Sequence, residues 1–171
     1  STNSDIYLYD LDGRSTENIT EGMPGYEKYP AFSPDGKKLA FMSMEIPGNE
    51  ADKERLMLYD IENRTVKYLT SGFDQDARHY AWSEDDSKIF FISGTKATYQ
   101  IYEITPEGDA IRQITKGTHD YTDISYAGNV LIGTKGTLSI PSEIFRVDAE
   151  TGQETQLTFT NKNIYDVVKL G

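Results

Sequence analysis

The chain has 171 residues, a formal net charge of −11 and an isoelectric point near 4.6. Nucleic-acid binding needs clustered Lys and Arg, and no such cluster exists, so this composition excludes nucleic acid and disfavours an anionic membrane as partner. Hydrophobic residues make up 37% and aromatic residues 12%, which is typical of a folded chain. The lack of cysteine excludes disulfides and thiolate chemistry.

The sequence contains no run of about 18 apolar residues that could span a bilayer. It begins STNSDIYLYD, without Met and without a charged-then-apolar leader. We therefore expect a piece excised from a longer chain. The compartment is not fixed by these features, although a periplasmic or extracytoplasmic location is favoured over a cytoplasmic one.

Four segments repeat one pattern along the chain. Each opens on an alternating apolar run, passes a polar turn, and closes on an aliphatic residue followed by Thr. The four segments are residues 5–22, 55–72, 100–117 and 143–160. The interval from the leading to the closing aliphatic residue is thirteen in the pairs Ile6–Ile19, Leu56–Leu69, Ile101–Ile114 and Ile144–Leu157. The threonines that follow, Thr20, Thr70, Thr115 and Thr158, are expected to end a strand and to bond the turn through their hydroxyls.

Between these segments lies a second recurring hairpin. PAFSPDGKKLAF (30–41) and YAWSEDDSKIFF (80–91) share one layout, in which two apolar runs flank a turn. In the first copy, Ser33-Pro34-Asp35-Gly36 suits a tight reversal, since Pro presets φ and Gly accepts a positive φ. The third copy, DISYAGNVLIGT (123–134), has weaker turn residues.

Four strands per unit and a repeat of 43–50 residues predict the blades of a β-propeller. Strands such as IYLY and LMLY are apolar on both faces, as stacked blades require. A sandwich would not keep a fixed internal interval over four copies. We predict an all-β fold, a partial β-propeller of about three to four four-stranded antiparallel blades from a larger ring. The expected divisions are a half blade at 4–22, blades at about 29–70, 79–115 and 122–158, and the start of a next strand at 163–170.

The combination AFSPDGKKLAF, LYD and LTSG resembles the Ser-Pro-Asp-Gly propeller repeat. This repeat occurs in the N-terminal propellers of the prolyl oligopeptidase family of serine peptidases and in the periplasmic propeller of the Tol system. Residues 48–91 resemble a middle blade of dipeptidyl- or acylaminoacyl-peptidase propellers. Residues 140–163 resemble the last blade before the catalytic domain of such peptidases.

The resemblance implies a non-catalytic propeller that gates peptide access to a C-terminal α/β-hydrolase domain and packs on it. The chain itself has no Gly-x-Ser-x-Gly elbow and no Glu-Glu pair, so we expect no catalytic residues and no cofactor within it. The alternative is a stand-alone Tol-type propeller that binds partner proteins. A propeller lyase or glycosidase is a weaker option, because it would need metal-ligand histidines that are missing here. Open blade edges predict self-association.

Several side chains could carry binding or chemistry. In the insertion at 44–54, Asp52, Lys53 and the adjoining Arg55 are candidates for contact with a substrate or a neighbouring domain. The only candidate bases are His79 and His119, for which a loop or strand-edge role is the default. Turn chemistry is favoured over a metal site for an acidic group, namely Asp74, Asp76, Asp85 and Asp86. Packing between blades is favoured over a carbohydrate platform for an aromatic group, namely Trp82, Tyr7, Tyr9, Tyr59 and Tyr102.

Overall fold

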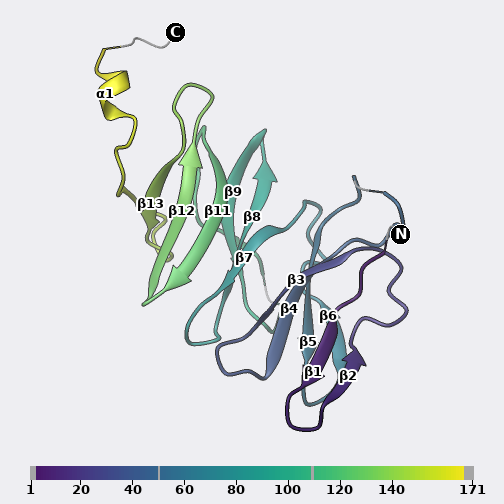
Figure 1. Cartoon of the computed structure of the whole chain (residues 1–171). Coiled ribbons are helices and arrows are strands. Elements are labelled where there is room, and N and C mark those ends of the chain that lie inside the picture. Colours follow the sequence, from purple (N-terminus) through teal and green to yellow (C-terminus); the bar gives the residue numbers. More distant parts are fainter. Residues whose placement is uncertain (1–2, 50, 109, 168–171) are drawn as a thin grey trace. The chain divides into compact units, whose positions relative to one another are not determined.

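The computed structural model describes residues 3–49, 51–108 and 110–167, with only the backbone of Tyr165. In this part of the chain, strands form one two-stranded and three four-stranded sheets, each in sequential order (Figure 1). The two-stranded sheet pairs β1 (Tyr7–Asp10) with β2 (Ser15–Asn18). The first four-stranded sheet consists of β3 (Glu27–Phe32), β4 (Lys38–Ser43), β5 (Arg55–Asp60) and β6 (Thr65–Tyr68). The second consists of β7 (Arg78–Trp82), β8 (Ile89–Thr95), β9 (Thr98–Ile104) and β10 (Arg112–Gln113). The third consists of β11 (Asp120–Ala127), β12 (Val130–Gly136), β13 (Glu143–Val147) and β14 (Glu154–Gln156). The prediction of an all-β, propeller-like fold with antiparallel four-stranded sheets is confirmed.

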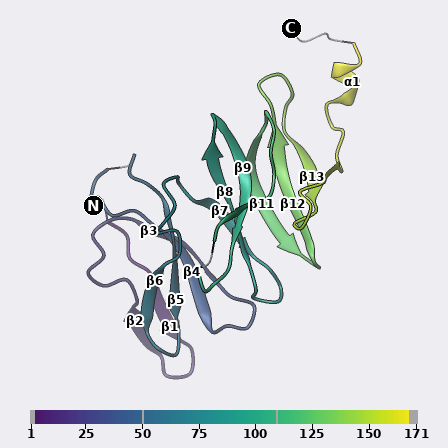
Figure 2. The ribbon, with the colours of Figure 1, turned by 180° about the vertical axis from the view of Figure 1, so that it is seen from behind.

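The chain divides into two compact units. The first comprises residues 1–78 and 106–108, and the second comprises residues 79–105 and 109–171. In the first unit, the β1–β2 pair packs on the β3–β6 sheet. In the second, the β7–β10 and β11–β14 sheets lie side by side, as both views show (Figures 1 and 2).

The β3–β4 turn is closed by one serine. The Ser33 amide donates to the Lys38 carbonyl oxygen at 2.9 Å, and the Ser33 hydroxyl donates to Asp35 Oδ1 at 2.8 Å. Gly36 takes a φ of 72°, the left-handed conformation that glycine adopts without steric cost. The turn predicted from Ser-Pro-Asp-Gly is therefore present.

The β7–β8 turn repeats this arrangement with a different sequence. Ser83 makes the same two bonds, to the Lys88 carbonyl oxygen at 2.9 Å and to Asp85 Oδ1 at 2.7 Å. Asp86 replaces the glycine and takes a φ of 60°, which Asp tolerates better than most residues. Serine and the first aspartate thus carry the turn in both copies, and the second copy forms it without Pro or Gly.

The hairpin predicted from weak turn residues has a strong turn. Gly128 and Asn129 have φ values of 57° and 58°, and Ala127 pairs with Val130. Two consecutive left-handed residues form the type I′ turn whose twist matches that of the flanking strands. The Gly-Asn pair therefore suits this reversal as well as Pro-Asp-Gly suits the first.

The thirteen-residue interval is the hydrogen-bond register between the last two strands of each of the four sequence repeats. The Leu69 amide donates to the Leu56 carbonyl oxygen at 3.0 Å, and the Leu56 amide donates in return to the Thr70 hydroxyl at 3.1 Å. The side-chain oxygen of Thr70 thus stands where a backbone carbonyl would continue the ladder. The same exchange occurs in every copy, with Thr20, Thr115 and Thr158 each accepting from the leading aliphatic residue at 2.9 Å. The predicted bond to the turn is wrong: each hydroxyl accepts the amide of the leading aliphatic residue, because the last strand of each repeat ends two residues before the threonine.

Each unit has its own apolar core. In the first unit, Ile6 and Ile19 from the ends of the β1–β2 pair pack on Phe41, Met57 and Tyr59 of the larger sheet. In the second unit, one apolar face of the β7–β10 sheet packs on the β11–β14 sheet. This core contains Phe90, Ile92, Ile101, Ile114, Tyr121, Ile124, Leu131 and Val147.

The aromatic residues expected to pack between blades divide into two sets. Trp82, Tyr59 and Tyr102 are buried. Tyr7 and Tyr9 are 60% and 53% exposed, so they do not pack between the sheets of this chain. Their neighbour Leu8 faces the first unit's core, and alternation along β1 puts both tyrosines on the opposite face.

The prediction of a strand at 163–170 is also wrong where the structure describes it. Residues Lys162–Tyr165 form a single helical turn, α1, and the Asp166 amide donates to the Lys162 carbonyl oxygen at 2.9 Å. Lys162 and Asp166 also pair at 2.7 Å across this turn. Residues 168–170 lie outside the described residues.

The register account predicts that Thr70→Val destabilises the chain by about 1–3 kcal/mol, because the nearly isosteric change leaves the buried Leu56 amide without an acceptor. Urea unfolding of the two proteins measures the difference. Thr70→Ser, which keeps the hydroxyl, should lose much less stability. The same Thr-to-Val change at the exposed Thr16 should alter stability by less than about 0.5 kcal/mol. Equal losses at Thr70 and Thr16 would contradict the account.

Candidate functional site

The insertion between β4 and β5 is organised around one buried carboxylate. The Asp52 side chain is only 7% exposed, and its Oδ2 accepts hydrogen bonds from the amides of Glu45 at 2.6 Å and Ile46 at 3.0 Å. Arg55 Nη1 donates to the same oxygen at 3.0 Å, and Arg55 Nη2 lies 3.1 Å from Glu45 Oε2. Asp52 and Arg55 therefore close the loop on itself.

Burial alone would raise the pKa of Asp52. The Arg55 guanidinium and the amides of Ile46 and Glu45 outweigh burial and lower this pKa to about 2. Lys53 donates from Nζ to the Phe73 carbonyl oxygen at 2.9 Å. The structure thus brings together the three residues singled out for contact, with polar atoms of each already engaged within the unit. Their contact with a substrate or domain stays a prediction.

Each of the two histidines lies beside a carboxylate. His79 is half-exposed, with Nδ1 3.6 Å from Asp123 Oδ1. His119 is largely buried, and its Nε2 lies 3.3 Å from Glu154 Oε1. Burial lowers the pKa of His119 against the opposing effect of Glu154. Within the described residues, no Ser or Thr hydroxyl bonds either imidazole, as an activated hydroxyl nucleophile would require.

The acidic group separates into structural roles. Asp76 accepts from the Glu54 amide at 3.1 Å and from Arg78 Nη2 at 2.9 Å, while Asp85 belongs to the β7–β8 turn. Asp74 is exposed and Asp86 takes the left-handed turn position. In the ranges that the structure describes, no three His, Cys, Asp or Glu side chains gather as a metal site would require.

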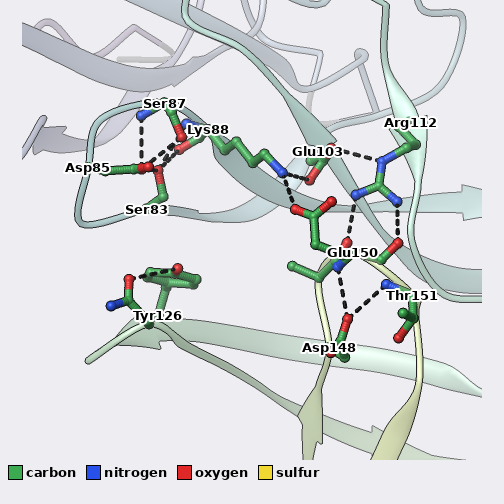
Figure 3. A network of polar contacts seen from close by, with 12 residues as sticks. Ser83, Asp85, Ser87, Lys88, Glu103, Arg112, Tyr126, Asp148, Glu150 and Thr151 are labelled. Carbon is green, nitrogen blue, oxygen red and sulfur yellow. Dashed lines mark hydrogen bonds and ion pairs between the residues drawn. The ribbon is translucent and has the colours of Figure 1, made fainter.

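A polar network couples the two sheets of the second unit (Figure 3). Lys88 Nζ lies 2.7 Å from Glu150 Oε1 and 3.4 Å from Glu103 Oε2. Arg112 bonds Glu103 Oε1 through Nε at 2.8 Å, and its Nη2 donates to the Ala149 carbonyl oxygen at 2.6 Å. The last strand of one sheet thus holds the β13–β14 turn of the next. Sequence reasoning missed this network, because its partners are up to 62 positions apart.

A second feature that sequence reasoning missed is the residue before each leading aliphatic. It is polar in all four copies, as Asp5, Arg55, Gln100 and Glu143. Gln100 accepts from the Thr115 hydroxyl at 2.8 Å and donates to the His119 carbonyl oxygen at 2.9 Å. Glu143 accepts from the Thr158 hydroxyl and, at 3.1 Å, from the Asn161 amide. The recurrence of a polar residue at one place in an apolar strand was the available signal.

The first unit also buries a carboxyl group at the start of β3. Glu27 is 2% exposed, and its Oε1 accepts from the Ser43 hydroxyl at 3.1 Å. Its Oε2 has no hydrogen-bond partner among the described residues. Burial raises the pKa of Glu27, and the nearby Asp5 adds to this effect, against the Ser43 bond. The ionised form is therefore unfavourable at this position.

The β11–β14 sheet carries a cavity of about 210 Å³ at the end where β12 passes into β13. Its lining includes Lys135, Glu143 and Phe145 from the strands and Ile140 and Pro141 from the β12–β13 loop. Thr137 orders this loop, because its Oγ1 accepts a hydrogen bond from the Ile140 amide at 3.0 Å.

Among the described helices, none is long and apolar enough to cross a membrane.

The model of the TolB beta propeller domain matches residues 1–165. The chain belongs to this family of propeller domains. The resemblance to the propellers of dipeptidyl and acylaminoacyl peptidases, drawn from the repeat, is confirmed by the relatives and structures that match nearly the whole chain.

Two dipeptidyl-peptidases 5 are similar in sequence. That of Porphyromonas endodontalis is 50% identical over 163 residues, and that of Porphyromonas gingivalis is 40% identical over 166 residues. The matches cover 95% and 97% of this chain but 24% of each relative, so the chain spans about a quarter of their length. The acylaminoacyl peptidase of Pyrococcus horikoshii matches in fold, with a TM-score of 0.75 at 23% identity over 96% of this chain and 24% of that one.

The loop account predicts that Asp52→Asn lowers stability at pH 7 by about 1–3 kcal/mol, because a charged hydrogen-bond acceptor is lost. The folded pKa is depressed, so the carboxylate's contribution is present above 3.8 and is lost as pH falls towards 2. The difference between variant and parent should shrink over that interval in urea unfolding. Asp74→Asn, an exposed control, should change little at any pH. A deficit of Asp52→Asn that persists unchanged at pH 2 would refute this account.

For Glu27 the opposite sign follows. Its folded pKa is raised above 4.5, so ionisation costs stability as pH rises through that value. Glu27→Gln should match the parent below about pH 4 and be more stable at pH 7. Unfolding free energies at the two pH values measure this difference. If Glu27→Gln matches the unmodified chain below about pH 4 but is less stable at pH 7, the folded state favours the charged carboxylate, and this account is wrong.

Proposed function

We propose that this chain is the non-catalytic propeller segment of a serine exopeptidase of the dipeptidyl or acylaminoacyl type. In this role it packs on an α/β-hydrolase domain outside the chain and gates the access of peptides to it. The observation that carries the proposal is the 40–50% identity to two dipeptidyl-peptidases 5 over nearly the whole chain.

The proposed gating role requires rigid blades. Each unit buries apolar residues between its sheets, which contributes about 25 cal/mol per Å² of apolar area removed from water. In the second unit, Lys88 and Arg112 add polar bonds between the sheets. Blades held in this way would admit a peptide and exclude a folded protein. The half blade at 4–22 and blades at about 29–70, 79–115 and 122–158 remain our proposed division.

One face of the β11–β14 sheet supports continuation of the ring. Ile144 and Leu157 are 39% and 50% exposed, whereas Ile101 and Ile114, at the same places in the preceding sheet, are 0% and 6% exposed. Those two pack on the next sheet in the second unit. The exposed pair would be covered in the same way by a further blade of the parent protein.

A Tol-type propeller that binds partner proteins is the competing proposal, and the match to the TolB beta propeller domain favours it. We also propose that the chain contacts a peptide substrate and self-associates through its open sheet edges. A full-length parent without hydrolase activity would select the Tol-type role.

The test uses the full-length parent and a fluorophosphonate probe, which labels activated serines. We expect hydrolysis of a chromogenic dipeptide substrate by the parent, with peptide mapping placing the label outside residues 1–171. The isolated chain should neither react nor hydrolyse. Label on a serine of this chain, or turnover by the isolated chain, would overturn the proposal. A heat-denatured parent controls for non-specific labelling.

A further inference from the structure

The cavity of the β11–β14 sheet contains a carboxylate without a cationic partner. Glu143 lines it and is only 6% exposed. Its bonds come from neutral groups, namely the Thr158 hydroxyl and the Asn161 amide and side chain. These donors hold the pKa of Glu143 below its ordinary value against the effect of burial, so the group is ionised near neutral pH. Among the described residues, no Lys, Arg or His lies within ion-pair distance of it.

The other charges at the cavity cancel. Lys135 is directly opposite Glu143 in the β12–β13 register, but its Nζ lies 2.6 Å from Glu154 Oε2 and 3.8 Å from the centre of the Phe145 ring. The Tyr121 hydroxyl donates to the other oxygen of Glu154 at 2.6 Å. His119 lines the cavity with its pKa lowered by burial, so it adds no positive charge at neutral pH. The cavity thus retains one uncompensated negative charge.

The remaining walls are mostly apolar. Ile140, Pro141 and Phe145 contribute them, and Gln156 is turned to its own strand end by its bond to the Thr158 carbonyl oxygen at 2.8 Å. An apolar cavity with a carboxylate suits an alkyl chain that carries a cation, since the methylenes bury against the walls and the charge meets the carboxylate. A free peptide amino terminus provides the cation but not this alkyl chain, which we call the stem.

We infer that this cavity binds the side chain of a lysine in a peptide, with Glu143 as the counter-ion and Ile140, Pro141 and Phe145 around the methylenes. The identification of the ligand as part of a peptide rests on the proposed function. The cavity and its charge do not, and binding can be measured on the chain alone. Nothing in the hydrolysis test depends on this cavity, so the two ideas fail separately.

Three small probes separate charge from stem. Nα-acetyl-lysine N-methylamide has the stem and its ammonium, Nα-acetyl-norleucine N-methylamide has the stem alone, and norleucine N-methylamide has a free amino terminus. NMR titration of the isotope-labelled chain at pH 7 should show the lysine probe shifting signals of Glu143, Phe145 and Ile140. The uncharged probe should bind at least about tenfold more weakly, which corresponds to the loss of one charged hydrogen bond.

Two variants localise the site. Glu143→Gln should weaken the lysine probe about tenfold or more, whereas Glu62→Gln, the same change on an exposed turn, should not. Because Glu143 also holds the segment after β14, thermal unfolding must accompany the titration. Ile140→Phe, at a half-exposed position, narrows the cavity without changing charge and should weaken the probe as well.

The inference fails if the lysine probe leaves the cavity signals unshifted at millimolar concentration, or if it binds Glu143→Gln as it binds the parent. Stronger binding of the free amino terminus than of the lysine probe would assign the site to a peptide's end instead of a side chain. Loss of thermal stability in Glu143→Gln with unchanged binding would leave Glu143 a purely structural role.

Discussion

The architecture depends on one exchange of hydrogen bonds that recurs between the last two strands of each sequence repeat. A backbone amide thirteen residues after the leading aliphatic donates to that residue's carbonyl, and the hydroxyl of the next Thr accepts its amide. The register places Ile19, Leu69 and Ile114 on buried faces. A slip of one residue would turn these side chains to the other face. The packing of these side chains between the sheets therefore depends on this pairing.

The sequence carried most of this arrangement, because it is local. The interval of thirteen, the Ser-Pro-Asp-Gly turn and two-faced apolar strands such as LMLY were sufficient for an all-β propeller with four strands per unit. What they could not predict depends on contacts distant in sequence. The pairing of Lys88 with Glu150 and of Arg112 with the β13–β14 turn exists only after two sheets pack. The exposure of Tyr7 and Tyr9 and the helical turn at Lys162–Tyr165 were likewise not evident from strand periodicity.

The candidate sites show how function is added to this repeat. The connection between the second and third strands differs in each sheet: a long loop at 44–54, a tight turn at Lys96 and Ala97, and a loop at 137–142. In each sheet, the third strand has a polar residue immediately before its leading aliphatic residue. In one sheet Arg55 is neutralised by Asp52 and Glu45, so charge serves loop order. In another, Glu143 keeps its charge unpaired beside a cavity. The same position thus supports structure in both copies, and in our proposal it also binds a ligand in the second.

Amide hydrogen exchange of the folded chain tests the shared register most directly. The amides of Leu56 and Ile101 donate to threonine hydroxyls that are 1% exposed, so they should exchange as slowly as the central amides of β4 and β8. The Ile144 amide, whose acceptor Thr158 is only half-buried, should exchange faster. Exchange of the Leu56 and Ile101 amides at the rate of exposed turn amides would contradict the account, because the hydroxyls would then not be closing the ladder.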